Sequence, residues 1–269
     1  MVSDSEIVFV TTALYTKWLD YQKNIIKKLF PESTHIIVDG RKLQEWPKSW
    51  FYWIDHIKQT QYKWYVLIDE DCFLSNREEL INVINKMNNE DINIMGCSDG
   101  YYEQRNYNPI AMNPFLMIGR ISDIDRIQID MKSFRFKLNT LRTGVGKLLY
   151  YWTNNSGVKF KQEYKDTFIY PHKIKGVANF LDGAEPYYFF FWYMKEIGCK
   201  FEYLYPHLDE YYNSTNPRIS ENSNDIAIHM WETRNCDSDT NFLGLSNKER
   251  WSRIKKYMDN KYDTSFTIK

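Results

Sequence analysis

The chain has 269 residues, of which 43% are hydrophobic and 26% charged, proportions that suit a globular protein with a sizeable core. Its 35 basic and 35 acidic residues give a formal net charge of zero, which argues against broad electrostatic binding to nucleic acid or to an anionic membrane. The four cysteines are widely spaced without a C-x-x-C pair, which fits neither a zinc site nor a disulfide scaffold. With no signal-peptide pattern and no segment resembling a membrane span, we expect a cytoplasmic protein.

The first half of the chain alternates between segments that have the patterns of strands and of helices. Strands are predicted over 7–12, 34–39, from Trp64 onward, 92–97 and 115–119, and helices over 16–30, from Pro47 and after a capping box at 75–78. Such alternation is typical of a mainly parallel central sheet flanked by helices. We therefore expect a single α/β domain.

The second half is less regular, and residues 122–180 are predicted to form an insertion or a subdomain. Beyond it the patterns predict a buried helix from Pro186 to residue 197, a strand over 200–205 ended by Pro206, a polar surface loop over 207–224, a strand over 226–231, and a final helix after a capping box at 246–249. His229 lies in the last of these strands, between two apolar neighbours. Taken alone, it has the pattern of a buried core histidine.

Three consecutive acids follow the predicted strand that begins at Trp64, and the outer two form Asp69-x-Asp71. Alternate residues of a strand share a face, so both carboxylates are expected to point at one site, while Glu70 points to the opposite face and is structural. Unpaired charge at the end of a buried strand is expensive to desolvate, and aspartate oxygens suit Mg²⁺ or Mn²⁺. The spacing therefore predicts a site for a divalent cation.

Other polar residues follow the predicted parallel strands at the ends where ligands bind. Thr11 and Thr12 close the first strand and Asp39 closes the second, so we expect them at the same edge of the sheet as Asp69 and Asp71. Each has an ordinary alternative. Asp39 precedes a glycine in a common turn pair, and acids that follow a strand are often solvated loop residues.

With these residues in place, the chain resembles glycosyltransferases of the GT-A fold. Residues 9–15 look like the opening strand and nucleotide-binding turn of these enzymes, and Asp69-Glu70-Asp71 looks like their Asp-x-Asp metal motif. His229 is similar to the late histidine that supplies a further metal ligand in several such families.

The resemblance implies an organisation and a set of ligands. It implies one GT-A-like domain, in which residues 1–121 form the nucleotide-sugar-binding half and residues 122–269 the acceptor-binding half. It also implies that Asp69, Asp71 and His229 bind Mn²⁺ or Mg²⁺, and that the partners are a nucleotide sugar and a glycan or protein acceptor.

Further roles follow from the same resemblance. The residues that it places on the nucleotide are Thr11, Thr12, Tyr15, Asp39, Asp69 and Arg234. Thr11 and Tyr15 would hold the base and ribose, and Asp39 would accept a hydrogen bond from a ribose hydroxyl. Arg234 is assigned to the diphosphate from its charge and its place in the sequence.

An inverting transfer needs a general base for the acceptor hydroxyl. Glu185 resembles that base, at the start of a predicted helix, and Asp182 is the fallback. The family often has an acidic pair where this chain has Ala184 and Glu185, so a retaining mechanism stays open. Glu185 is equally typical of a carboxylate that favours the positive end of a helix.

We therefore expect a metal-dependent glycosyltransferase that moves a sugar from a nucleotide diphosphate, with UDP preferred, to a hydroxyl acceptor. Other functions remain as alternatives. A haloacid-dehalogenase-like phosphatase carries its Asp-x-Asp after the first strand and a small residue where this chain has Phe73. A nucleotidyltransferase would need a glycine-rich basic loop, which residues 11–16 do not provide. A carbohydrate-binding protein explains the 17% aromatic content but not the paired acids.

Overall fold

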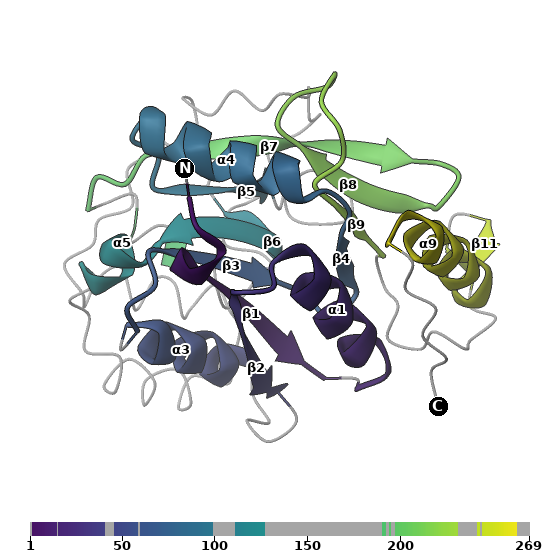
Figure 1. Ribbon diagram of the computed structural model, residues 1–269, viewed down its shortest axis with the longest axis horizontal. Helices are drawn as coiled ribbons and strands as arrows, with labels where there is room; N and C mark the ends of the chain where they lie inside the picture. Colours follow the sequence, from purple (N-terminus) through teal and green to yellow (C-terminus); the bar gives the residue numbers. More distant parts are fainter. Residues whose placement is uncertain are drawn as a thin grey trace, which may run out of the picture.

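The computed structural model (Figure 1) describes most of the N-terminal half of the chain and parts of the C-terminal half. The described residues are 2–14, 16–40, 46–58, 60–98, 111–126, 190–191, 194, 197–230, 241–242 and 244–262. The insertion predicted over 122–180 lies almost wholly outside them. Of the helix predicted from Pro186 to residue 197, four residues are described. Phe190, Phe191 and Met194 are helical and buried, and Ile197 lies in a turn. In these ranges, no helix combines the length and hydropathy needed to cross a membrane.

The described residues form one nine-stranded sheet and a separate two-stranded pair. The strands of the large sheet are β1 (Ile7–Ala13), β2 (Thr34–Asp39), β3 (Trp64–Ile68), β4 (Cys72–Leu74), β5 (Ile94–Ser98), β6 (Met112–Arg120), β7 (Phe201–Asp209), β8 (Ser214–Arg218) and β9 (Ala227–His229). They follow the order β2-β1-β3-β6-β5-β7-β8-β9-β4. The small pair joins β10 (Asn241–Phe242) to β11 (Leu245–Ser246).

The large sheet has a mainly parallel part and an antiparallel part. Strands β2, β1 and β3 run parallel, as do β5 and β7, while β6 lies between β3 and β5 and runs opposite to both. Beyond β7, strands β8, β9 and β4 pair antiparallel. The predicted α/β fold, a central sheet flanked by helices, is confirmed. The carboxyl ends of β1, β2 and β3 lie at one edge, because parallel strands share their direction.

The sheet bends back on itself after β3. Only residues 69–71 separate β3 from β4, yet the strand order places β4 at the far edge, beside β9. The amide of Ser75, just past β4, also donates to the carbonyl of Ile226 at 2.9 Å. The short connection therefore brings the far edge of the antiparallel part next to the end of β3.

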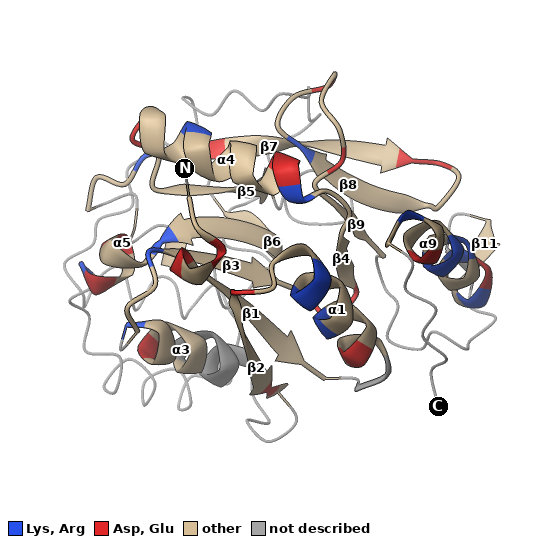
Figure 2. Ribbon diagram, in the orientation of Figure 1, with Lys and Arg blue, Asp and Glu red and all other residues tan. Residues whose placement is uncertain are grey.

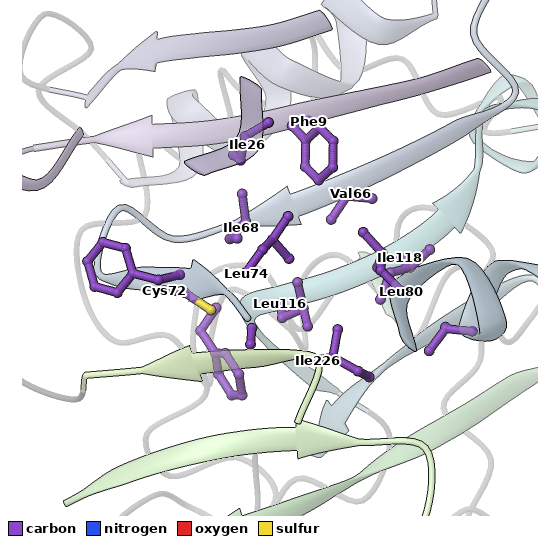
Figure 3. Packing of buried hydrophobic residues seen from close by; sticks show 14 of the residues in the cluster. Phe9, Ile26, Val66, Ile68, Cys72, Leu74, Leu80, Leu116, Ile118 and Ile226 are labelled. Atoms are coloured by element: carbon purple, nitrogen blue, oxygen red, sulfur yellow. The ribbon is translucent and has the colours of Figure 1, made fainter. Parts of the chain in front are cut away.

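Helices cover both faces of the parallel part. The described helices are η1 (Asp4–Glu6, a 3₁₀ turn), α1 (Thr16–Leu29), α3 (Trp46–Ile57), α4 (Arg77–Asn89), α5 (Ile121–Asp125) and α9 (Asn247–Tyr262). The faces follow from strand alternation. Val66 and Ile68 of β3 pack in one core cluster with Ile26 of α1 and Leu80 of α4 (Figure 3). Tyr65 points the other way and contacts Trp53 of α3, with ring centroids 5.4 Å apart.

Charged residues gather on the helices and loops, and the central strands are almost free of them (Figure 2). Strands β1, β3 and β5 contain no charged residue at all. Every residue of β3 is buried. The three acids that begin at Asp69 therefore follow directly on an uncharged and fully buried strand.

One predicted helix start is confirmed and the other is wrong by one residue. At α9, the amide of Ser246 donates to Glu249 at 3.0 Å and the amide of Glu249 donates back to the Ser246 hydroxyl at 3.2 Å, as a capping box requires. At α4 the cap is Asn76, whose side chain accepts from two amides of the first turn. The predicted cap, Ser75, instead donates its hydroxyl to the carbonyl of Asp225 at 2.8 Å.

Two predictions for the C-terminal half are wrong. Pro206 does not end β7, and the predicted loop over 207–224 contains strand β8. Proline lacks a backbone donor, but β7 pairs with β5 only as far as Leu204, and on its other side Pro206 faces Pro217. Neither proline is needed as a donor at that point, so the strand continues to Asp209.

The close approach of β3 and β6 generates a stability prediction. Tyr65 and Gly119 are cross-strand neighbours, and a Cβ added at Gly119 would collide with the Tyr65 ring. We expect Gly119→Ala to lower the free energy of unfolding by about 1–3 kcal/mol, as overpacking does, measured by urea denaturation. In a Tyr65→Leu background the same change should have a smaller effect. An equal loss in both backgrounds would contradict the explanation.

Candidate metal centre

The acidic residues lie on a tight turn between β3 and β4. The amide of Cys72 donates to the carbonyl of Asp69 at 3.0 Å, which closes the turn. Residues 69–71 are therefore not part of a strand, and the extended geometry predicted for them is wrong. The turn nevertheless brings the side chains of Asp69 and Asp71 to one side, where both are partly buried.

His229 reaches the turn through the antiparallel part of the sheet. Cys72 of β4 lies opposite His229 of β9, and the amide of Met230 donates to the Asp71 carbonyl at 3.0 Å. The imidazole stacks on Phe115 with 4.2 Å between ring centroids and 5° between planes. Its Nε2 lies 3.4 Å from Oδ1 of Asp71. Backbone pairing and ring stacking together fix the place of this side chain, which is 4% exposed.

The three side chains form a group that fits a divalent cation. One potential ligand atom from each of Asp69, Asp71 and His229 lies within 4.8 Å of the others. Ligands bound at about 2.1 Å to one ion stand roughly 3–4 Å apart, so a small adjustment of the side chains brings these atoms to bonding distance. Carboxylates suit Mg²⁺ and Mn²⁺, whereas imidazole is favoured by transition metals. The donor set therefore fits Mn²⁺ better than Mg²⁺.

Glu70, the middle acid, is not part of this group and ties the turn to the end of β1. It is 9% exposed, and its Oε1 accepts a hydrogen bond from the amide of Leu14 at 3.3 Å. Leu14 directly follows β1, so this contact joins the carboxyl end of one strand to the turn that follows another. The position agrees with the structural role predicted for Glu70.

A buried polar network, centred on Gln22 of α1, supports the turn. Gln22 of α1 donates from its amide nitrogen to the carbonyls of Asp69 and Cys72, the latter at 2.8 Å. Its amide oxygen accepts from the Thr11 hydroxyl at 2.9 Å, and that hydroxyl lies 2.9 Å from Nε2 of His35. Thr11 and Gln22 are fully buried. The network connects β1, β2 and α1 to the acidic turn.

Gln22 was missed as a site residue by the sequence patterns. It falls in the apolar stripe of α1, where a helical spacing with Trp18 and Ile25 suggests core. Its residue type could have indicated a special role, because an amide side chain in an apolar stripe needs buried hydrogen-bond partners. Its partners are carbonyls of the metal turn, which no local pattern identifies.

Some of the residues predicted to bind the nucleotide lie at the carboxyl edge of the parallel strands. Thr12 lies near the end of β1 and Asp39 at the end of β2, both partly buried at the predicted edge. Thr11 is fully buried, with its hydroxyl engaged inside the protein, so its predicted contact with a nucleotide does not fit this position. The predicted residues Tyr15, Asp182, Glu185 and Arg234 lie outside the described residues.

Comparisons with known proteins leave the family unassigned. No family model matches the chain, and no curated protein matches its sequence. Three solved structures overlap with it at TM-scores of 0.35 to 0.41. A mannosyltransferase from Pyrobaculum calidifontis in complex with GDP-Man and Mn²⁺ shares 11% identity at a TM-score of 0.35, over 46% of each chain.

Two further solved structures overlap to a similar degree. A glycosyltransferase involved in glycosylation of the major capsid of PBCV-1 shares 9% identity at a TM-score of 0.41, over 93% of this chain and 98% of that one. A protein from STIV shares 10% identity at a TM-score of 0.35, over 46% of this chain and 69% of that one. At these TM-scores the overlaps assign no function.

The supporting network generates a pH prediction. Burial, with a smaller contribution from the charge of Lys23, lowers the pKa of His35 to about 4, whereas an unfolded histidine titrates near ~6.5. Between these two pH values, His35 is protonated in the unfolded chain but neutral in the folded protein, so protonation favours unfolding. The contribution of neutral His35 to the free energy of unfolding is therefore complete above about pH 6.5. It falls by roughly 3 kcal/mol as the pH is lowered toward about 4.

We expect His35→Gln, which keeps a donor near Thr11 but cannot titrate, to lose less stability than the wild type over that range. Chemical denaturation at about pH 7 and about pH 4.5 gives the two differences. Equal losses in both proteins would show that His35 is not the group responsible.

Proposed function

We propose that the protein is a metal-dependent glycosyltransferase that moves a sugar from a nucleotide-diphosphate donor, with UDP preferred, to a glycan, protein or other hydroxyl acceptor. The observation that carries the proposal is the meeting of Asp69, Asp71 and His229 beyond the carboxyl end of β3. The Asp-x-Asp motif and the late histidine were singled out separately in the sequence. Their convergence is what a shared ion requires.

Sugar transfer from a nucleotide diphosphate leaves an anionic group, and a bound cation supplies Lewis-acid stabilisation of that charge, typically several kcal/mol. The chain's own contribution is to hold the ligands still. Asp71 is fixed through its carbonyl by the amide of Met230, and His229 is fixed by Phe115. The 3.4 Å approach to Asp71 makes Nε2 of His229 its metal-facing nitrogen.

The remaining roles complete the proposal. Asp39 accepts a hydrogen bond from the ribose, Thr12 and Tyr15 contact the nucleoside, and Arg234 contacts the diphosphate. Glu185, with Asp182 as the fallback, takes the proton of the acceptor hydroxyl as that oxygen attacks the sugar, in an inverting transfer.

The position of Phe73 disfavours the phosphatase alternative. Phe73 is fully buried and packs on Trp18 and Tyr21, with ring centroids 6.1 Å and 5.7 Å away. The Asp-x-Asp motif of haloacid-dehalogenase-like phosphatases has a small residue at this place. Here the chain turns into the core directly after Asp71.

The first functional prediction concerns binding. We expect Mn²⁺ with a UDP-, GDP- or CMP-linked sugar to raise the melting temperature, because a ligand at ~100 times its Kd adds about 2.7 kcal/mol to the free energy of unfolding. Asp71→Asn keeps the shape of the side chain and should abolish the shift. Asp20→Asn, at an exposed carboxylate of α1, is the matched control and should behave as the wild type.

The outcomes separate the alternative functions. Release of nucleotide from the donor, blocked by EDTA and by Asp71→Asn, supports a transferase. Turnover of simple phosphate esters would indicate a phosphatase, and binding of glycans without nucleotide release would indicate a carbohydrate-binding protein. A full shift in Asp71→Asn with EDTA present would rule out the metal role.

The second functional prediction concerns the base. With an acceptor in hand, Glu185→Gln should lower kcat by about 10²–10⁴-fold, the usual contribution of general base catalysis, and leave the donor-induced thermal shift intact. The same change at Asp182 tests the fallback. Unchanged turnover in both variants would leave an inverting mechanism without its proposed base.

A further inference from the structure

A single buried carboxamide holds both ends of the acidic turn. Gln22 donates to the carbonyl of Asp69, where the turn begins, and to the carbonyl of Cys72, where it ends. The same two residues are joined by the 3.0 Å hydrogen bond from the Cys72 amide to the Asp69 carbonyl. Gln22 is fully buried, and its side chain contacts the backbone of the turn. Its side chain therefore sets where the turn lies relative to α1 and β1.

Thr11 and His35 fix which way the carboxamide points. Thr11 donates its hydroxyl proton to the amide oxygen of Gln22 at 2.9 Å. A hydroxyl has one proton, so the same oxygen accepts from Nε2 of His35, 2.9 Å away. A reversed carboxamide would aim its oxygen at two carbonyl oxygens, which can only accept, and both hydrogen bonds to the turn would be lost. Its nitrogen would replace the acceptor that now receives the proton of the Thr11 hydroxyl. The hydroxyl of Thr11 and the two carbonyls together therefore direct the nitrogen of Gln22 at the turn.

The two halves of the metal centre share supports from β9 and Phe115, and the turn has one further support of its own. His229 belongs to β9 and is fixed by its strand pairing and by Phe115. Asp69 and Asp71 belong to the turn. The amide of Met230 donates to the Asp71 carbonyl and the amide of Asp69 donates to the Phe115 carbonyl, both at 3.0 Å, and α1 holds the turn in addition through Gln22. The distance between the carboxylates and the imidazole consequently depends in part on where Gln22 holds the turn.

We propose that Gln22 is a positioning residue of the metal centre, oriented by Thr11 and His35, and that it brings the two carboxylates into register with His229 without touching the ion. This inference rests on the metal site of the proposed function. It assigns the affinity for the ion in part to a neutral helix residue that is not a ligand.

The test is the affinity for Mn²⁺ alone, measured from the EPR signal of the free ion. Gln22→Met keeps the length of the side chain and removes its donors. We expect its Kd for Mn²⁺ to rise by about tenfold or more, the usual effect of losing a group that orients metal ligands. Ile25→Val, a buried change less than one turn further along α1, is the control for general loosening and should keep the wild-type Kd.

A second pair of variants avoids any change at Gln22. Thr11→Val removes the hydroxyl that orients the carboxamide and should weaken Mn²⁺ binding in the same direction, whereas Thr11→Ser restores the hydroxyl and should restore the Kd. If folded Gln22→Met and Thr11→Val both keep the wild-type Kd, Gln22 is only a satisfied core amide and the proposal is overturned.

Hydrogen exchange in the metal-free protein distinguishes failure of this inference from failure of the proposed function. The amide of Cys72 closes the turn, so Gln22→Met should speed its exchange by about tenfold or more, while Ile25→Val should leave it close to the wild type. If the wild type binds no Mn²⁺, the metal role fails, and with it the positioning of a metal centre. If the wild type binds Mn²⁺ but transfers no sugar, the proposed function fails and the positioning role stands.

Discussion

The turn from Asp69 to Cys72 is the constraint on which the carboxyl edge of the sheet depends. A buried, uncharged strand ends there in three acids, and the backbone must reverse without leaving polar groups unsatisfied. A buried carbonyl with no donor costs about 1–3 kcal/mol. Gln22 supplies donors to two carbonyls at once, and Glu70 accepts from the end of β1. The middle acid is thus used for structure, which leaves the outer two for a ligand.

The same turn decides the shape of the sheet. Because β4 begins directly after it and pairs with β9, the antiparallel part is drawn back beside the end of β3. His229 then arrives at the acids through strand register instead of through a loop. The candidate metal centre lies where the parallel and antiparallel parts meet, so its geometry depends on both. A change in the register of β9 by one residue would turn the imidazole to the opposite face.

Sequence patterns succeeded where the determinant is local. The apolar runs of β1 and β2 and the stripe of α1 appear in the structure within one residue of the predicted bounds, and β3 begins at the predicted Trp64. They failed where partners are remote. Strand β8 has the polar sequence Ser-Thr-Asn-Pro-Arg and is held by Asn216 and Arg218, which both donate to Asp225. Strand direction is also non-local, so the reversed β6 could not be derived from its own residues.

The candidate site shows the same division. Asp-x-Asp after a buried strand is a local signal, and it identified the acids although the turn replaced the expected extended geometry. Gln22 and the engaged hydroxyl of Thr11 were not identified, because their partners are distant in the sequence: two carbonyls for Gln22, and the side chains of Gln22 and His35 for Thr11. Neutral groups are the physically sensible support here. A lysine or arginine in place of Gln22 would also donate to the carbonyls, but its charge would compensate the carboxylates and weaken their attraction for a cation. An amide holds the turn and leaves the negative charge available.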